Sequence, residues 1–398
     1  AEIEKEDAEV PKHLKDGNRD KEGFGHGEGY VYPHAYREHW AAQQYLPSAL
    51  RGKTFYNPSE VGYEGRIRDE VLRKRELQAA VILQDLERGT AEAEGLSWSA
   101  ASKGREGWFK RLESSRSRTL LEDRDLLFSE LTVQRHDRLL VCNADEGLLL
   151  WEALRRAPEG LAAGIVQSQQ SLQTLLHFAK QSMTTLEEEE LPRLMVLADQ
   201  DIPDRSDAEE YLSTGTFEYI LARDLFRRPL PSKTISDRIT SFSQRARSLL
   251  VPGGRLALIG SPPRRGMRIA SLIEEEIPRL ENIESETIKD LIHSLKEAEA
   301  VFWDNYKSAW EWEDLESDLR SAGFETKSNI LKRSEERLIS TSDINSWFDT
   351  EKSSWGKSMA NQLGAERLGA IRDLMYSLAK QGPLTWKWEA VLIHATAV

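Results

Sequence analysis

The chain has 398 residues with a hydrophobic content of 39%, so we expect two or three folded units with sizeable cores. Its net charge of −13 argues against a broad grip on nucleic-acid phosphates. One cysteine, Cys142, no apolar run of roughly 18 residues and no signal-peptide pattern predict a cytoplasmic protein with no disulfide, no cysteine-cluster zinc site and no membrane partner. Because the chain begins at Ala1 in a charged run without an initiator Met, we expect a piece of something longer.

Residues 23–47 combine closely spaced glycines with large aromatic rings. Four alternating glycines disfavour regular helix or strand, so an extended, ordered loop is expected. Its rings must be covered, because so many exposed rings would form an adhesive patch. Stacking on single-stranded nucleic acid is the alternative, but Lys and Arg are sparse here, which favours docking on protein with Trp40 or Tyr45 largely buried. Three nearby histidines lack a metal-ligand spacing and a cysteine partner, so structural roles are predicted for His26, His34 and His39.

Five short motifs follow one another between residues 10 and 76. They are Val10-Pro11-Lys12-His13-Leu14-Lys15-Asp16, Gly25-His26-Gly27-Glu28-Gly29-Tyr30, Tyr32-Pro33-His34, Gln43-Gln44-Tyr45-Leu46-Pro47 and Phe55-Tyr56-Asn57-Pro58, and Gly62-Tyr63-Glu64 then leads into a helix. This order resembles the C-terminal end of the replication-associated recombination AAA+ ATPases, the RarA/MgsA family.

The family resemblance implies a role in DNA replication and repair. It also implies partners upstream of the matched residues, namely an ATPase core and a helical tetramerisation region. The sequence contains no Gly-x-x-x-x-Gly-Lys-Ser/Thr phosphate loop, so the ATPase activity is not carried by this chain. We therefore expect contact with DNA only through the full-length protein, and self-association is a further possible interaction.

The next segment is helical with a break. Apolar residues recur at helical spacing over residues 64–88, which completes a first unit of 1–88. The small polar run after Gly89 predicts a linker over 89–104. Residues 97–134 again have helical character and would form a cap before the first strand of a second unit, 105–398.

From Asp137 onward, strand and helix patterns alternate, which predicts an α/β fold with a doubly wound, mostly parallel seven-stranded sheet. Helical insertions are expected at about 269–322 and 342–380, the second beginning at Ser342 or Asp343 as N-cap. The expected strands are 138–142, 162–166, 194–198, 217–222, 255–260, a sixth from Phe324, and 386–396, and the helices between them include 148–156, 168–181, 236–250 and one ending at Gly323.

This succession resembles the class I S-adenosylmethionine (SAM) methyltransferase fold. The resemblance is carried by residues 139–147, 164–168, 217–220 and 249–256. In that family a turn with three glycines approaches SAM, an acid after strand two holds the ribose, and an acid after strand three reaches the adenine. The matching positions here, which form a degenerate SAM crevice, are Asn143, Asp145, Gly147, Val166 and Asp199.

The crevice departs from the family pattern. Side chains at Asn143 and Asp145 would occupy ligand space, although both residue types tolerate left-handed backbone. Val166 cannot hydrogen-bond a ribose, so Asp199 is a lone match. We therefore expect no ordinary SAM binding, and we predict no cofactor for this chain.

The sequence also predicts no catalytic residues and no metal ligands. The Asn/Asp-Pro-Pro-aromatic loop of many nitrogen methyltransferases is replaced by 223–228. Asp145 and Glu146 are interpreted as a solvated turn, Cys142 as buried and inert, and the aromatic residues of 302–312 as core. The sequence thus favours a non-catalytic interaction or assembly module attached to an ATPase. A working SAM methyltransferase with an unusual turn is the alternative, and a binder of another nucleotide-like ligand is a third reading.

Overall fold

The computed structural model describes Tyr56, Pro58, Ser59 and residues 61–90, 106–182, 191–228, 230, 233–279, 286–306, 309–337 and 339–398. The aromatic segment 23–47, with its predicted docking through Trp40 or Tyr45, lies outside the described residues. The same holds for His26, His34 and His39, and for the expected linker from Ala91 onward. Among the helices that are described, none is long and apolar enough to cross a membrane.

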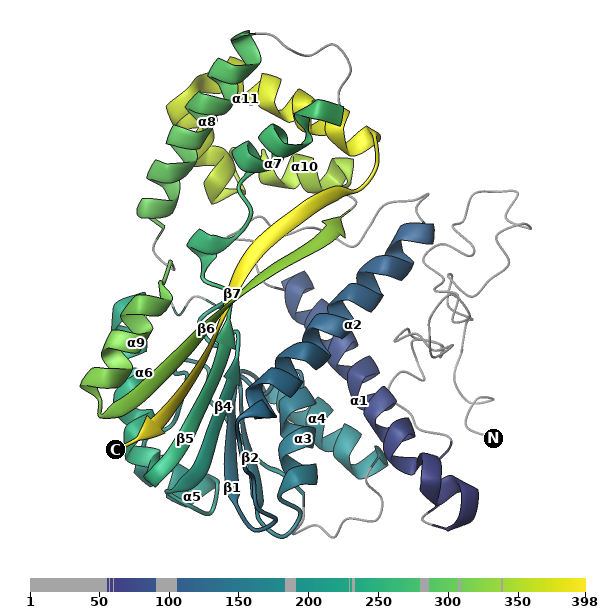
Figure 1. The fold of residues 1–398 in the computed structure, drawn as a ribbon, viewed down its shortest axis with the longest axis vertical. Coiled ribbons are helices and arrows are strands. Elements are labelled where there is room, and N and C mark those ends of the chain that lie inside the picture. Colours follow the sequence, from purple (N-terminus) through teal and green to yellow (C-terminus); the bar gives the residue numbers. More distant parts are fainter. Residues whose placement is uncertain are drawn as a thin grey trace.

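The sheet has seven strands in the order β3-β2-β1-β4-β5-β7-β6, and helices flank both faces (Figure 1). Neighbours from β3 to β5 are parallel, whereas β7 is antiparallel to both β5 and β6. The predicted doubly wound, mostly parallel α/β sheet is thus confirmed. The strands are β1 Arg138–Cys142, β2 Leu161–Val166, β3 Arg193–Val196, β4 Phe217–Arg223, β5 Leu250–Gly260, β6 Phe324–Arg337 and β7 Leu384–Ala397.

Eleven α-helices are recognised in the part of the chain that the structure describes. Their bounds are α1 Gly62–Thr90, α2 Glu106–Ser129, α3 Leu148–Arg156, α4 Gln169–Ser182, α5 Arg205–Tyr211, α6 Ile235–Leu249, α7 Ile269–Glu276, α8 Glu286–Asp304, α9 Trp312–Ser321, α10 Thr341–Trp347 and α11 Ser354–Lys380, with short 3-10 turns at Pro263–Arg265 and Ile277–Arg279.

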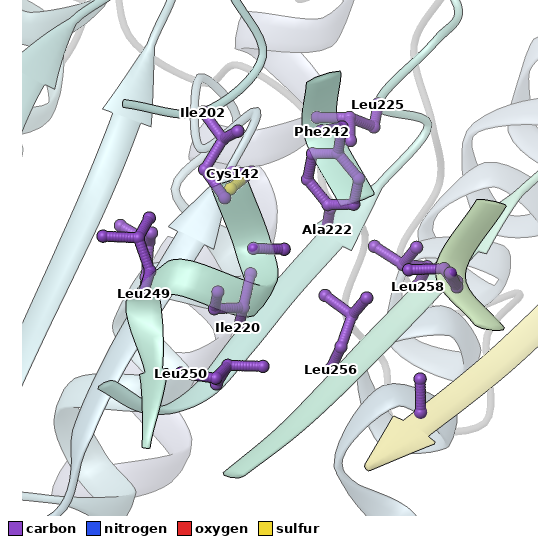
Figure 2. Packing of buried hydrophobic residues seen from close by; sticks show 14 of the residues in the cluster. Cys142, Ile202, Ile220, Ala222, Leu225, Phe242, Leu249, Leu250, Leu256 and Leu258 are labelled. Atoms are coloured by element: carbon purple, nitrogen blue, oxygen red, sulfur yellow. The ribbon is translucent and has the colours of Figure 1, made fainter. Parts of the chain in front are cut away.

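Alternating side chains of the central strands build two separate cores. On one face, residues such as Leu140, Cys142 and Ile220 pack against α5, α6 and α9 (Figure 2). On the other face, Leu139 and Val141 pack against α2, α3 and α4. Buried parallel strands are expected to be apolar on both faces, which is why their sequences read as near-continuous hydrophobic runs.

A helical lobe forms a third core above the sheet (Figure 1). Strands β6 and β7 pair along their whole length, from Phe324↔Ala397 to Arg337↔Leu384, but β5 pairs only with residues 391–396 of β7. The remainder of the β6–β7 ribbon projects beyond the sheet, where Leu384 and Trp386 join the core of α7, α8, α10 and α11.

The two expected insertions differ in detail from the structure. Within 269–322, helix α9 packs on the sheet through Leu315 and Leu319, so only α7 and α8 enter the lobe. The predicted N-cap of the second insertion is wrong, because Ser340 caps α10 in a capping box with Asp343 as its third helical residue. The fifth strand, expected at 255–260, begins earlier: residues 250–254 belong to β5, and the β4–β5 ladder is irregular there, passing from Phe217↔Leu250 to Tyr219↔Arg255.

Candidate functional site

The sheet reverses its winding direction between β1 and β4, and this topological switch point is where α/β proteins usually bind ligands. The turn after β1 bends there in the left-handed region, with Asn143 at φ +55° and Gly147 at φ +75°. A side chain at Gly147 would collide with Trp151 Nε1 at 2.6 Å and Leu175 Cδ2 at 2.8 Å. Local packing alone therefore requires glycine at position 147.

Asn143 spans the switch point. Its Nδ2 donates a hydrogen bond of 2.9 Å to the carbonyl oxygen of Arg223, the last residue of β4. The amide that replaces the first family glycine thus ties the ends of β1 and β4 together. The groups that would meet a ligand at this point are hydrogen-bonded to each other.

Asp145 connects the turn after β1 to the end of the neighbouring strand, β2. Its Oδ1 accepts a hydrogen bond of 2.9 Å from the backbone N–H of Gln167, directly after β2. The side chain is 3% exposed, and burial raises its carboxyl pKa. Val166, which ends β2, is completely buried in the core with α3 and α4. The interpretation of Asp145 and Glu146 as a solvated turn is therefore wrong for Asp145, because the ends of β1 and β2 are packed together.

Arg223 is the centre of an ion cluster above the switch point. Its Nε contacts Asp123 Oδ2 of α2 at 2.7 Å, and its Nη1 lies 2.9 Å from Glu146 Oε1 and 3.4 Å from Asp224 Oδ2. Asp123 also pairs with Arg333 of β6. Burial alone would lower the pKa of Arg223, but the carboxylates of Glu146, Asp224 and Asp123 raise it. The guanidinium is permanently charged and already neutralised by the protein.

The acid predicted to reach an adenine is exposed, whereas a second acid nearby is buried. Asp199 lies on the surface after β3. Two residues later, Asp201 accepts hydrogen bonds of 3.0 and 2.7 Å from Arg238 of α6. Arg238 also donates to the backbone oxygen of Arg228 at 2.6 Å. The Asp201–Arg238 pair thus holds the loops after β3 and β4 in place.

The predicted crevice residues are therefore brought to one edge of the sheet, where Asn143 Nδ2 and Asp145 Oδ1 hydrogen-bond to protein and Asp199 is exposed. Cys142 is fully buried, and burial raises its thiol pKa, as expected for an inert core residue. No cluster of three or more His, Cys, Asp or Glu side chains within the described ranges could hold a metal ion.

Sequence reasoning missed Asp123, Asp201 and Arg223. An arginine that ends an apolar strand needs buried acids around it, so Arg223 was the available signal. Its partner Asp123 is 100 residues away in the chain, and no local pattern connects the two residues.

Solved structures to which the chain is similar include the YcgJ protein from Bacillus subtilis, at 10% identity and a TM-score of 0.39, covering 70% of this chain and 98% of that one. The cyclopropane synthase MmaA2 from Mycobacterium tuberculosis has 14% identity and a TM-score of 0.35, covering 81% and 97%. These likenesses are too distant to bear on function. The strand order of the sheet itself defines the fold.

The first 75 residues match the family model of the MgsA AAA+ ATPase C terminal. The replication-associated recombination protein A of Bacillus subtilis (strain 168) is 46% identical over 55 residues, which are 14% of this chain and 13% of that protein. The chain thus spans only a small part of the length of this relative. Residues 1–75 are thus similar to the C-terminal domain of the MgsA/RarA recombination ATPases, and the chain continues into an α/β domain built on a seven-stranded, mostly parallel sheet.

Proposed function

We propose that this chain is the C-terminal portion of a replication- and recombination-associated ATPase, and that its α/β domain is a non-catalytic interaction or assembly module. The hydrogen bond from Asn143 to Arg223 across the switch point carries this proposal. In the same place, Arg223 is neutralised by Asp123 and Glu146. Side chains of the protein therefore engage both the carbonyl oxygen and the guanidinium of Arg223 at the place where a cofactor would otherwise bind.

The partners follow from the matched segment. The upstream ATPase and helical regions of the full-length protein are the primary ones, and DNA is reached through them. Self-association through the aromatic segment 23–47 is a further proposal. The acidic chain itself should bind duplex DNA weakly at physiological salt. A submicromolar, salt-sensitive complex in a fluorescence anisotropy titration would contradict this assignment of DNA contact.

Calorimetry with SAM tests the non-catalytic role. We expect no binding tighter than about 1 mM, equivalent to roughly −4 kcal/mol. The variant Asn143→Gly/Asp145→Gly, which restores the family glycines, shows whether the two side chains alone exclude the cofactor. Micromolar affinity in the parent chain would instead establish the alternative, an active methyltransferase with unusual turn residues.

One observation favours a second candidate, a binder of another nucleotide-like ligand. Asp145 Oδ2 is buried and accepts no hydrogen bond of ordinary geometry among the described residues, although the Ser171 side chain acts to lower the pKa of this carboxyl. A ligand that donates a hydrogen bond would therefore compete with Ser171 for this carboxyl. A panel of nucleosides and nucleotides in a thermal shift assay tests this reading, because a ligand raises Tm when it binds only the folded state. The shift should vanish in Asp145→Ala.

A further inference from the structure

Helix α1 packs against the two helices that border the switch point. Leu77 and Ala80 of α1 are buried against Leu120 of α2 and Leu148 of α3. The crossing of α1 behind α2 is visible in Figure 1. Because Leu148 directly follows Gly147, this small core includes the residue next to the turn after β1.

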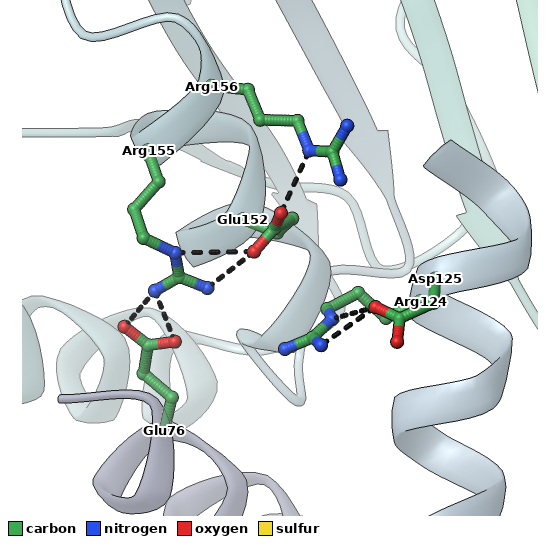
Figure 3. Close-up of polar contacts among 6 residues, drawn as sticks. All are labelled: Glu76, Arg124, Asp125, Glu152, Arg155 and Arg156. Atoms are coloured by element: carbon green, nitrogen blue, oxygen red, sulfur yellow. Dashed lines mark hydrogen bonds and ion pairs between the residues drawn. The ribbon is translucent and has the colours of Figure 1, made fainter. Parts of the chain in front are cut away.

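A buried ion cluster accompanies the apolar contact (Figure 3). Arg155 of α3 contacts the carboxylate of Glu76, whose side chain is 2% exposed, and its Nη2 lies 2.7 Å from Glu152 Oε2. Arg156 Nε reaches Glu152 Oε1 at 2.8 Å. Arg155 thus bridges the Glu76 carboxylate of α1 and the Glu152 carboxylate of α3, although burial raises the pKa of Glu76.

The contacts of α1 lie just beyond the matched ATPase segment. The family match ends at residue 75, whereas Glu76, Leu77 and Ala80 belong to the following turns of the same uninterrupted helix. We call the matched residues 1–75 the ATPase-type domain. The helix at its end therefore continues into the turns that dock on the α/β domain.

The same two neighbours of α1 also hold the Arg223 cluster. Leu120 lies about one helical turn before Asp123, which pairs with Arg223. Leu148 lies two residues after Glu146, the second partner of Arg223. Displacement of α1 would expose Leu120 and Leu148 together, and thus remove support from both sides of the switch point.

We propose that α1 is a coupling helix, through which the ATPase-type domain and the switch-point turn 143–148 stabilise one another. This inference rests on the proposed function for the identity of the upstream domain. Linkage is reciprocal: a movement of the ATPase-type domain that pulls on α1 loosens the turn, and an occupant of the switch point that moves the turn loosens α1. The surface of α2 and α3 is therefore a docking site for the α1 helix of the same chain.

Hydrogen exchange measured by mass spectrometry on the whole chain tests this coupling. Leu77→Asp places a charge in the small core, and Glu76→Gln weakens only the ion cluster. Both variants should raise exchange in α1 and in the peptide 139–150, by on the order of tenfold for Leu77→Asp and less for Glu76→Gln. Peptides from α8 and α11 should keep the parent rates.

The matched control is Glu70→Gln on the same helix, where the Glu70 side chain is 64% exposed in its pair with Lys74; it should leave all peptides unchanged. Faster exchange confined to α1 would overturn the coupling, because α1 would then dock on α2 and α3 without affecting the turn 143–148. A uniform increase that includes the lobe in both variants would also overturn it, since the effect would then be global. SAM binding by the parent would refute the non-catalytic role without altering this readout.

Discussion

Two regions of the molecule bury carboxylates in opposite ways. On the α2–α3 side of the sheet, Asp123 and Glu152 each face two arginines. In the helical lobe, Glu299 accepts hydrogen bonds from the backbone N–H groups of Ile269 and Ala270, at 3.0 and 3.1 Å, and from the Trp355 indole at 3.2 Å.

The difference has an electrostatic consequence. Burial alone would raise the pKa of Glu152, but Arg155 and Arg156 overcome this effect and lower it to about 2. For Glu299 burial prevails over the N–H donors and raises the pKa. At Glu152 the two arginines thus keep the carboxylate ionised, whereas at Glu299 the N–H donors of a helix N-terminus and the nearby Arg268 do not compensate its desolvation.

The largest effect should come from Asp123→Ala. This change leaves the guanidinium groups of Arg223 and Arg333 without their shared carboxylate, so we expect a loss of roughly 3–5 kcal/mol in the free energy of unfolding, measured by urea denaturation. Asp125→Ala is the matched control, because its side chain is 64% exposed in the neighbouring pair with Arg124. It should change stability by less than about 1 kcal/mol. Equal losses in the two variants would remove the distinction between buried and exposed acids.

The contribution of Glu152 to the free energy of unfolding should depend on pH in the direction set by its lowered pKa. Its pKa is lower in the folded state than the unfolded value of 4.5, so its contribution is complete above pH 4.5 and is lost as the pH falls toward 2. The shift corresponds to roughly 3 kcal/mol. In Glu152→Gln the decline of stability over this window should be shallower than in the parent, as followed by chemical denaturation at each pH. Parallel curves would contradict the lowered pKa.

The pH dependence of the contribution of Glu299 to stability should have the opposite sign. Because its folded pKa is raised above 4.5, its stabilising contribution is complete below pH 4.5 and decreases as the pH rises through the folded value. Glu299→Gln keeps one acceptor oxygen and no charge. We expect its stability relative to the parent to improve as pH rises from 4.5, as followed by chemical denaturation at each pH. A fall in the stability of Glu299→Gln relative to the parent over the same pH range would mean that the lobe also compensates the charge of Glu299.

The smallest effects concern two glycines of α11. Gly364 interrupts the helix at φ +78° and ψ 163°, a conformation costly for a residue with a Cβ, so Gly364→Ala should destabilise by about 1–2 kcal/mol. Gly369, in the same helix with no atom within 4 Å of an added Cβ, is the matched control. Gly369→Ala should stabilise by about 0.5–1 kcal/mol, and differential scanning calorimetry would resolve the opposite signs. A gain for both variants would show that the break at Gly364 is not required.

The strands of the sheet could be predicted because each one produces a local hydrophobic pattern in the sequence. Strand β1 and helix α3 have the predicted bounds, 138–142 and 148–156, since an apolar run, a turn and an amphipathic segment adjoin each other there. The capping box of α10 was missed because Ser340, Ser342 and Asp343 are all good capping residues, and the choice between them depends on packing.

The site was predictable in position but not in its contacts. The crevice residues meet at the carboxyl ends of β1, β2 and β3, as parallel topology requires. Glu76, Asp123 and Arg223 could not be placed, because their partners come from elements about 80 to 100 residues away in the chain. Long-range ion pairs leave no periodic trace in a sequence.

The projecting ribbon of β6 and β7 sets the cooperativity of unfolding in the lobe. A two-stranded ribbon is at best marginally stable alone, and among the described residues no third strand pairs with 331–337 or 384–390. Their backbone hydrogen bonds persist because Leu384 and Trp386 are buried among the lobe helices. The ribbon extension and the four helices therefore constitute a single foldon, whose amides should exchange with one common opening free energy, distinct from that of the sheet.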